Sequence, residues 1–323
     1  MTHIVWAPKK VICATPMRTS HSPLPLDDGR PSRLPSSKLR LVYQHGFHAG
    51  CFQDVMKHSV LVLLLARMCE KPSPFMYVET HAGAGRYDFE AALPQEISGG
   101  IKLLQSDYCT TVPPEASTLL GLLDHFAEGS KQYYPGSPLV AVSQCRPQDT
   151  VVLCEFAADQ HELLTSVMAE VARVHQNLPT IKIHLADGYK ALQQKRGVAT
   201  PERRGLVFVD PPYSYGSDTQ RAVALAVHLR VNWRSARFCL WYPATRAHSK
   251  VVDSFRGASL GACLAAELFR GGEDGKGTGM LLVQPPFGIE VELRELLNGL
   301  ARSLRREGEE SLEVRVRWVS SEE

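Results

Sequence analysis

The sequence has no closely paired cysteines, no long apolar run and little net charge, and each shortage argues against a class of protein. Its eight cysteines include no C-x-x-C pair, which argues against a structural zinc site and indicates free thiols in a reducing compartment. The longest apolar run, Val60 to Ala66, is far shorter than the roughly 20 residues that a membrane helix needs. We therefore expect a soluble protein with no membrane contact.

The formal net charge is only +2, and it is unevenly distributed. Residues 1–40 hold seven Lys or Arg against two Asp, a balance of +5, which leaves 29 basic and 32 acidic residues, a balance of −3, in the remainder. A protein that binds nucleic acid without specificity normally has a basic stripe. Composition alone thus favours a protein with no nucleic-acid role, and any RNA binding must rest on a local patch.

Residues 1–40 form a segment of their own, in which six prolines prevent a continuous helix. The segment is rich in Arg and Ser and poor in acids, as organelle targeting peptides are, but these also need an amphipathic helix, for which only the residues ahead of Pro16 have room. We predict a disordered N-terminal extension that acts as a targeting segment, with a mitochondrial or other organellar location. The alternative is a plain disordered extension on a cytoplasmic protein.

The stretch from Asp210 to Tyr213, Asp-Pro-Pro-Tyr, directly follows the apolar run Leu206 to Val209. Such a run is typical of a buried parallel strand, and active sites of open α/β sheets gather at the carboxyl ends of these strands. The Asp210 carboxylate and the Pro211 carbonyl can each accept an N–H of a planar amine, while the Tyr213 ring offers a face for stacking. We predict that Asp210, Pro211 and Tyr213 are the catalytic residues.

A second apolar run, Phe75 to Glu79, leads into a glycine turn at Gly83 and Gly85. Because glycine has no Cβ and tolerates positive φ, such a turn lets the backbone approach a cofactor closely. Asp88 stands where the third small residue of a dinucleotide fingerprint would be, so the turn alone is weak evidence for a nucleotide site.

Two further apolar runs end in acidic residues. Val151 to Cys154 ends at Glu155, a natural acceptor for ribose hydroxyls, and Ile181 to Leu185 is followed by Asp187 and Gly188, which can flank an adenine. Four predicted strands in succession thus end in polar groups, which we expect at one edge of a sheet. This pattern suits S-adenosylmethionine better than NAD.

The order of a simple nucleotide-binding sheet is interrupted after the glycine turn. Glu155 comes 70 residues after Gly85, whereas the second acid usually follows within about 20 residues. Helical spacing in between predicts a small helical subdomain at about residues 88–148. Further along the chain we expect three strands, a helix and a last strand, at Phe238 to Trp241, Ala265 to Phe269, Met280 to Val283, Ile289 to Arg305 and Leu312 to Trp318.

Several motifs occur together in one order along the chain. They are Tyr43 to Gly50, Asp54 to His58, Thr80 to Tyr87, Tyr133 to Pro138, Ala186 to Gly188, Asp210 to Tyr213, Trp241 to Pro243 and Thr278 to Pro286. In this order they resemble the RlmJ-type 23S rRNA adenine-N6 methyltransferases, over nearly the whole chain from about Tyr43 to Trp318. The resemblance implies a Rossmann-like class I S-adenosylmethionine-dependent methyltransferase sheet at 41–320, with the helical insertion between its first two core strands.

The resemblance also implies roles for single residues. His58 and His81 are expected to contact S-adenosylmethionine, and the cofactor set is His58, His81, Gly83, Ser137, Glu155, Asp187 and Gly188. Tyr43 and Lys57 are expected on the side of the substrate RNA, with Tyr43 as a lid over cofactor or base. No metal site is expected, since His45, His48, His58 and His81 lack the ligand spacing of a zinc motif.

The predicted function is transfer of a methyl group from S-adenosylmethionine to the N6 of one adenine in large-subunit rRNA, by a monomer that flips the base into the Asp-Pro-Pro-Tyr pocket. One alternative is an N-methyltransferase that acts on another amine, in DNA adenine or in a protein glutamine. A second is a ribosome-assembly factor that has kept the fold and lost the chemistry.

Overall fold

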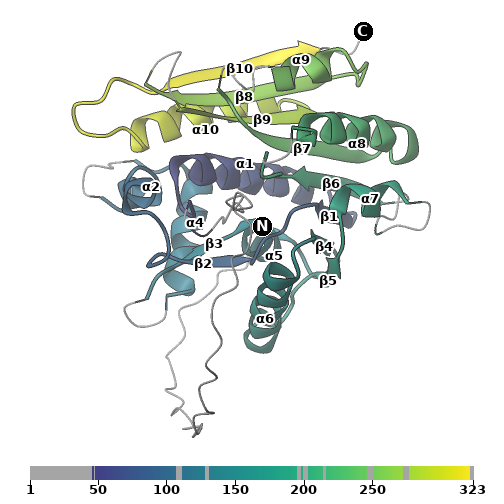
Figure 1. Cartoon of the computed structure of the whole chain (residues 1–323), viewed down its shortest axis with the longest axis horizontal. Coiled ribbons are helices and arrows are strands. Elements are labelled where there is room, and N and C mark those ends of the chain that lie inside the picture. Colours follow the sequence, from purple (N-terminus) through teal and green to yellow (C-terminus); the bar gives the residue numbers. More distant parts are fainter. Residues whose placement is uncertain are drawn as a thin grey trace, which may run out of the picture.

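The computed structural model describes residues 46, 48–106, 111–127, 131–194, 198, 203–213, 216–245, 250–271 and 276–320. Eight strands make the central sheet: β1 (Phe75–Glu79), β4 (Thr150–Glu155), β5 (Thr180–Leu185), β6 (Arg204–Val209), β7 (Ala236–Pro243), β8 (Cys263–Arg270), β9 (Lys276–Val283) and β10 (Glu313–Ser320). Their order in the sheet is β10-β8-β9-β7-β6-β1-β4-β5 (Figure 1).

The sheet has a parallel half and an antiparallel half. Strands β5, β4, β1, β6 and β7 run parallel to one another, while β9, β8 and β10 continue the sheet beyond β7 in antiparallel pairs. The central strands are buried on both faces, which explains why they appear in the sequence as unbroken apolar runs. All the strands predicted from apolar runs are confirmed, with ends that differ by a few residues.

Helices cover both faces of the sheet (Figure 1). One apolar core packs strands against α1 (Phe52–Cys69), α4 (Pro114–His125), α5 (Ser137–Gln144), α6 (Ala158–Val174) and α10 (Ile289–Ser303). A second core, on the other face, packs strands against α7 (Gly188–Gln193), α8 (Asp218–Asn232) and α9 (Lys250–Arg256). The arrangement is the three-layer α/β architecture expected for a mostly parallel sheet.

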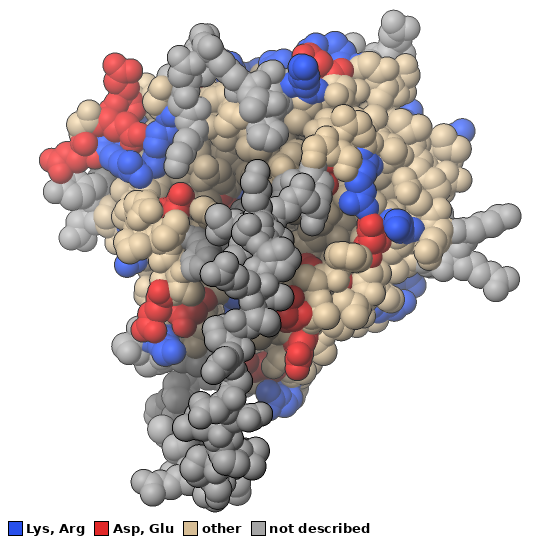
Figure 2. Space-filling view, viewed as in Figure 1, with Lys and Arg blue, Asp and Glu red and all other residues tan. Residues whose placement is uncertain are grey.

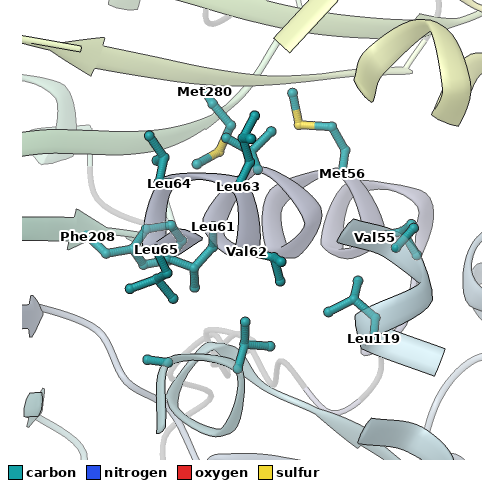
Figure 3. Close-up of a cluster of buried hydrophobic side chains, with 14 of the residues drawn as sticks. Val55, Met56, Leu61, Val62, Leu63, Leu64, Leu65, Leu119, Phe208 and Met280 are labelled. Atoms are coloured by element: carbon teal, nitrogen blue, oxygen red, sulfur yellow. The ribbon is translucent and has the colours of Figure 1, made fainter. Parts of the chain in front are cut away.

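Helix α1 is apolar on nearly all sides because it is buried between the sheet and the helical insertion. Leu64 points toward Met280 of β9, and Val55 points toward Leu119 of α4 (Figure 3). This packing fixes the N-terminal half of α1, which carries Asp54, Lys57 and His58. The predicted helix over these residues is confirmed.

Between β1 and β4 the described residues form α4, α5 and four shorter elements. These are the strands β2 (Arg86–Asp88) and β3 (Tyr133–Pro135), which pair with each other, and the helices α2 (Pro94–Ser98) and α3 (Ile101–Leu104). The predicted domain limits stay a prediction, since residues 1–40 lie outside the described part of the chain. Among the described residues, no helix is long and apolar enough to cross a membrane, and no cluster of three potential metal ligands occurs.

Candidate active site

The carboxyl ends of β1 and β6 meet where the order of the sheet reverses. From β1 the chain passes to β4 and β5 on one side, and it returns to β6 on the other side of β1. Open α/β sheets bind their ligands at such a switch point. The Thr80 amide donates to the Phe208 carbonyl (3.1 Å) and the Ala82 amide donates to the Cys154 carbonyl (3.0 Å). The loop after β1 is therefore anchored to both neighbouring strands.

The glycine turn after β1 is held by distant parts of the chain. Gly83 and Gly85 have φ values of +62° and +82°, a region that favours glycine. The Gly83 amide donates to Oε2 of Glu155 (2.8 Å), and the Gly136 amide donates to the Gly85 carbonyl (2.8 Å). Glu155 and the start of the helix that begins at Ser137 thus lie at the same turn.

Glu155 combines a carboxylate with neighbouring apolar surface. Its Oε1 accepts a hydrogen bond from the Ala157 amide (2.7 Å), and each carboxylate oxygen keeps a lone pair for a ligand hydroxyl. Phe156 is 76% exposed, and Leu185, at the end of β5, is 56% exposed. An acid beside exposed apolar side chains fits a nucleoside, with ribose hydroxyls on Glu155 and the base against the apolar groups. Phe156 was not predicted, although its place directly after a strand-ending acid marks it.

Asp187 and Gly188 lie at the start of α7, against the end of β1. Asp187 caps the helix by accepting the Tyr189 amide (3.1 Å), and it also accepts a hydrogen bond from Arg221 (2.5 Å). A Cβ on Gly188 would lie 2.4 Å from the Thr80 carbonyl oxygen, so only glycine allows this close approach. Both predicted residues therefore reach the same sheet edge as the glycine turn.

Asp210 is paired with a buried lysine. Lys57 Nζ donates to Asp210 Oδ2 at 2.6 Å and pairs with Asp54 Oδ1 at 2.8 Å. Burial acts to lower the pKa of Lys57, but the carboxylates of Asp210 and Asp54 raise that pKa well above its usual value. Lys57 therefore remains a cation. It occupies one oxygen of Asp210 and leaves Oδ1 as an acceptor for a ligand.

Two aromatic rings lie beside this pair. Tyr213 has a φ of +52°, in the left-handed region that few non-glycine residues adopt, and strained backbone of this kind collects at functional sites. Its hydroxyl donates to the Trp241 carbonyl (3.0 Å), and the two rings meet edge to face with centroids 6.0 Å apart. Lys57 Nζ lies 5.5 Å from the centre of the Trp241 ring. Trp241 is thus a further site residue that was not assigned a role from the sequence.

The two predicted cofactor histidines have different surroundings. His81 borders the glycine turn, where its Nδ1 shares a hydrogen bond with the Thr80 hydroxyl (2.7 Å). Burial lowers the pKa of His81 to about 4, so its imidazole is neutral at neutral pH. His58 is buried in α1 beside Lys57, and its Nδ1 shares a hydrogen bond with the Tyr134 hydroxyl (2.9 Å).

Ser137, another predicted cofactor residue, donates its hydroxyl to the carboxylate of Glu79. Glu79 is fully buried at the end of β1, and its second oxygen accepts from the Tyr77 hydroxyl (3.0 Å). Burial raises the pKa of Glu79 to about 8, although the hydrogen bonds from Ser137 and Tyr77 favour the ionised form. Glu79 was not predicted as a site residue, despite being a strand-ending acid like Glu155.

The raised pKa of Glu79 predicts a pH dependence of stability. Because the folded state holds this proton up to about pH 8 and the unfolded chain releases it near 4.5, the residue lowers the unfolding free energy progressively as pH rises between these values. Gln at this position does not titrate. We expect Glu79→Gln to become more stable relative to the parent from pH 5 to 8, as measured by urea unfolding. A stability difference that is constant with pH would contradict the assignment.

Tyr43, predicted as a lid, lies outside the described residues, so its role stays a prediction. Most of the other predicted residues lie at the carboxyl ends of β1, β4 and β6 or at the starts of α5 and α7. His58 differs, because its imidazole meets Tyr134 of β3, and its contact with the cofactor stays a prediction. Asp210 and Tyr213 lie on one side of this edge of the sheet with Lys57. The glycine turn, Glu155 and Asp187 lie on the other side of the edge. This separation is expected if the first group holds the methyl acceptor and the second group holds the nucleoside of the cofactor.

Comparison with known proteins identifies relatives across most of the chain. A family model described as RsmJ, ribosomal RNA large subunit methyltransferase D, RlmJ, matches residues 72–320. Ribosomal RNA large subunit methyltransferase J of Escherichia coli is 30% identical over 82% of this chain and 94% of its own length. The protein of the same name from Haemophilus influenzae is 30% identical over 87% of this chain and 100% of its own length.

A solved structure agrees with these relatives. The crystal structure of a Legionella pneumophila protein has a TM-score of 0.71 and 26% sequence identity, and the match covers 84% of this chain and 98% of that one. The prediction of an organellar location was wrong, because the two curated relatives are bacterial enzymes. The alternative of a cytoplasmic enzyme fits them. The basic, proline-rich composition of residues 1–40 was therefore misleading as a targeting signal.

The family match and the sheet architecture lead to one conclusion. The chain belongs to the RlmJ family of ribosomal RNA large subunit methyltransferases, and it has the Rossmann-like class I fold of enzymes that take their methyl group from S-adenosylmethionine.

Proposed function

We propose that this enzyme methylates the exocyclic N6 of one adenine in large-subunit rRNA. The substrate class is extended from the names of the relatives in E. coli and H. influenzae. The choice of an amine acceptor rests on one observation, the 2.6 Å contact between Lys57 and Asp210 at the switch point of the sheet. A carboxylate with one oxygen held and the other available suits an N–H donor.

The chain has a suitable donor and acceptor set for S-adenosylmethionine, which supplies an electrophilic methyl group when bound. The residues proposed to hold it are His58, His81, Gly83, Ser137, Glu155, Asp187 and Gly188. Glu155 is proposed to accept the ribose hydroxyls, with Phe156 and Leu185 as apolar cover for the adenine ring. The contact of Glu155 with the glycine turn and the exposure of the two apolar side chains support this assignment. Neutral His81, at the glycine turn, is proposed to contact the methionine part.

Asp210 and Pro211 act on the acceptor amine. The N6 amine of adenine is a poor nucleophile because its lone pair is delocalised into the ring. Asp210 Oδ1 and the Pro211 carbonyl each accept one N–H, which favours a tetrahedral nitrogen whose lone pair faces the methyl group. The rate gain comes from positioning and electrostatics, since the groups are fixed before the reaction. The released proton passes to Asp210 or to water.

Tyr213 is proposed to stack on the adenine after the base has left its helix. Stacking of a base on an aromatic side chain contributes about 1–3 kcal/mol, and it does not depend on which base is stacked. Because its hydroxyl is fixed by the Trp241 carbonyl, the Tyr213 ring is held in place before the base arrives. The contacts of Asp210 and Pro211 with the amine exclude bases that lack one, whereas selection of adenine over cytosine requires further contacts with the edge of the base.

On the face seen in Figure 2, the distribution of charge predicts few phosphate contacts with RNA. On the face shown in Figure 2, the described Lys and Arg side chains stand in small groups beside acidic ones and form no broad basic area. Affinity for RNA is then expected to come from few phosphate contacts, with a shallow dependence on salt. Tyr43 and Lys57 are proposed on the RNA side of the site. Lys57 contacts protein carboxylates here, so we propose that it acts on the substrate through Asp210.

Removal of either acid in the nucleoside subsite should weaken cofactor binding. We expect Glu155→Ala or Asp187→Ala to lower the affinity for S-adenosylmethionine by about tenfold or more, since hydrogen bonds to charged groups contribute ~1.5–3 kcal/mol. Calorimetry measures the affinity. Glu162→Ala, which removes an exposed acid from α6, is the matched control and should bind like the parent. Unchanged binding in both site variants would refute the subsite assignment.

Transfer of a labelled methyl group to purified acceptors tests the proposed function. Large-subunit rRNA lacking the modification, DNA and protein are each incubated with the enzyme and labelled S-adenosylmethionine. We expect label in the rRNA only. Label in DNA or protein would favour a different amine acceptor, and cofactor binding without transfer to any acceptor would favour a non-catalytic assembly factor.

We propose that residues 41–320 act as one methyltransferase domain with the insertion at about 88–148, and that the enzyme works as a monomer without a metal ion. Sedimentation at working concentrations tests the oligomeric state, and activity that survives dialysis against a chelator tests the independence from metal.

A further inference from the structure

Asp54 lies in the first turn of α1 and connects two features that are far apart in sequence. Its Oδ1 pairs with Lys57 Nζ (2.8 Å), which in turn contacts Asp210 Oδ2 (2.6 Å). Its Oδ2 accepts the backbone N–H of Gly50 at 3.0 Å. Asp54 is 2% exposed and Lys57 is 3% exposed, so water contributes little to holding either charge.

The chemistry of this position requires a carboxylate. Two donors, an ammonium and a backbone amide, approach different oxygens of Asp54. An asparagine has one oxygen acceptor and one NH₂ donor, so it would turn its NH₂ group toward either Lys57 or the Gly50 amide. In one orientation the buried Gly50 amide loses its acceptor, which is costly. In the other orientation Lys57 faces an NH₂ group and keeps only Asp210 as a carboxylate partner.

The same carboxylate fixes the chain that enters α1. Gly50 has a φ of +76°, and a Cβ there would lie 3.1 Å from the side chains of Ile101 and Tyr134. Its carbonyl accepts the Ile101 amide (2.9 Å), so this point of the backbone is packed against the helical insertion. Asp54 thereby connects a fixed backbone position to the ammonium that holds Asp210.

Lysine has four rotatable side-chain bonds, and its ammonium takes a single position only where contacts define one. At Lys57 these contacts are Asp54 on one side, Asp210 on the other and the Trp241 ring at 5.5 Å. Without Asp54, Lys57 Nζ can move around Asp210 and cover Oδ1, the oxygen that the acceptor amine needs.

We propose that Asp54 is a positioning residue for methyl transfer, which holds Lys57 on Oδ2 of Asp210 so that Oδ1 faces the acceptor amine. This inference rests on the proposed function. Asp54 touches neither the methyl group nor the amine, and it acts through Lys57. Its loss should therefore lower kcat much more than it changes cofactor affinity.

The test compares Asp54→Asn with a matched buried aspartate. We expect Asp54→Asn to lower kcat by about 10- to 100-fold, as a small misplacement of a reacting group does. The dissociation constant of S-adenosylmethionine should stay within a few-fold of the parent. Asp149 is the control, because it is also buried and also holds a backbone amide, that of Phe75 (3.0 Å), and a cation, Arg146 (2.8 Å). Asp149 directly precedes β4, so it lies at the amino end of this strand, whereas Asp210 follows the carboxyl end of β6.

Asp149→Asn should lower the unfolding free energy and leave kcat close to the parental value. Equal losses of kcat in Asp54→Asn and Asp149→Asn would overturn the proposal, since both would then reflect general destabilisation. In the Lys57→Met background, Asp54→Asn should cause little further loss of kcat, because coupled residues are not additive. A full additional loss in that background would show that Asp54 does not act through Lys57.

Misfolding of Asp54→Asn, failure of the proposed function and failure of the positioning role give different results. If Asp54→Asn does not fold, as judged by circular dichroism, Asp54→Ser replaces it with the same expected results, since its smaller side chain leaves room for a water. If the parent transfers no methyl group to rRNA, the proposed function has failed. If the parent is active and Asp54→Asn keeps the parental kcat, only the positioning role is refuted.

Discussion

Replacement of Asp210 by alanine is expected to lower methyl transfer by about 10²-fold or more, because a positioned polar group that acts mainly in the transition state contributes on this scale. In the proposed mechanism Asp210 faces the acceptor amine, with Lys57 on its other oxygen. Among the described residues, Asp210 makes no hydrogen bond or ion pair with Glu155 or Asp187. Cofactor affinity should therefore stay within a few-fold of the parent. Single-turnover transfer to rRNA and calorimetry measure the two effects separately.

Asp210→Asn refines this prediction. Asparagine keeps one acceptor oxygen, so its NH₂ group faces either Lys57 or the acceptor amine, and we expect activity between those of the parent and Asp210→Ala. Activity as low as that of the alanine variant would show that the charge or proton acceptance is essential and that positioning is not the main effect. Full activity in both variants would reduce Asp210 to a turn residue.

Replacement of Lys57 by methionine is expected to lower the unfolding free energy by about 3–5 kcal/mol, the usual cost of removing one partner from a buried ion pair. The Lys57 side chain is 4% exposed and lies between two carboxylates, and the variant removes this cation from the Asp54 side chain, which is 3% exposed. Urea unfolding at neutral pH measures the loss. Methionine fills a similar volume, so the change reports the charge more than the packing.

The matched control is Lys102→Met, in which an exposed lysine on α3 is replaced. Surface changes of this kind usually alter stability by no more than about 0.5 kcal/mol. A similarly small loss in Lys57→Met would contradict the buried pair that the structure shows. A large loss in both variants would point to a general effect of added methionine.

The sheet could be predicted from the sequence because its central strands are buried on both faces. Burial makes β6 an unbroken apolar run, and the residue after such a run, Asp210, must lie at the carboxyl edge of the sheet. The same reasoning placed Glu155 after β4. These predictions use only local sequence and a general rule of topology, which is why they did not require the structure.

Contacts between distant residues could not be predicted in this way. Lys57 and Asp210 are 153 positions apart, and Ser137 and Glu79 are 58 positions apart. The sequence shows that each residue is near a strand end or a helix start, but it does not show which side chains meet. Asp54 was part of a recognised motif without a role, because its two partners, Lys57 and the Gly50 amide, are defined by the folded backbone.

The exposure of Phe156 could not be predicted from the sequence either. An aromatic residue after a strand-ending acid was visible in the sequence, but whether it is buried or exposed depends on how α6 leaves the sheet. The structure leaves it 76% exposed beside Glu155. The location was mispredicted for a similar reason, because composition at residues 1–40 does not distinguish a targeting segment from another basic extension.

The central claim, methylation of adenine N6 in large-subunit rRNA at Asp210, is tested most directly by mass spectrometry of nucleosides. Unmodified rRNA is incubated with S-adenosylmethionine and either the parent enzyme or Asp210→Ala, and it is then digested and analysed. We predict N6-methyladenosine at one position with the parent and almost none with the variant. A methyl group on another base or atom, or equal N6-methyladenosine with the two proteins, would contradict the account.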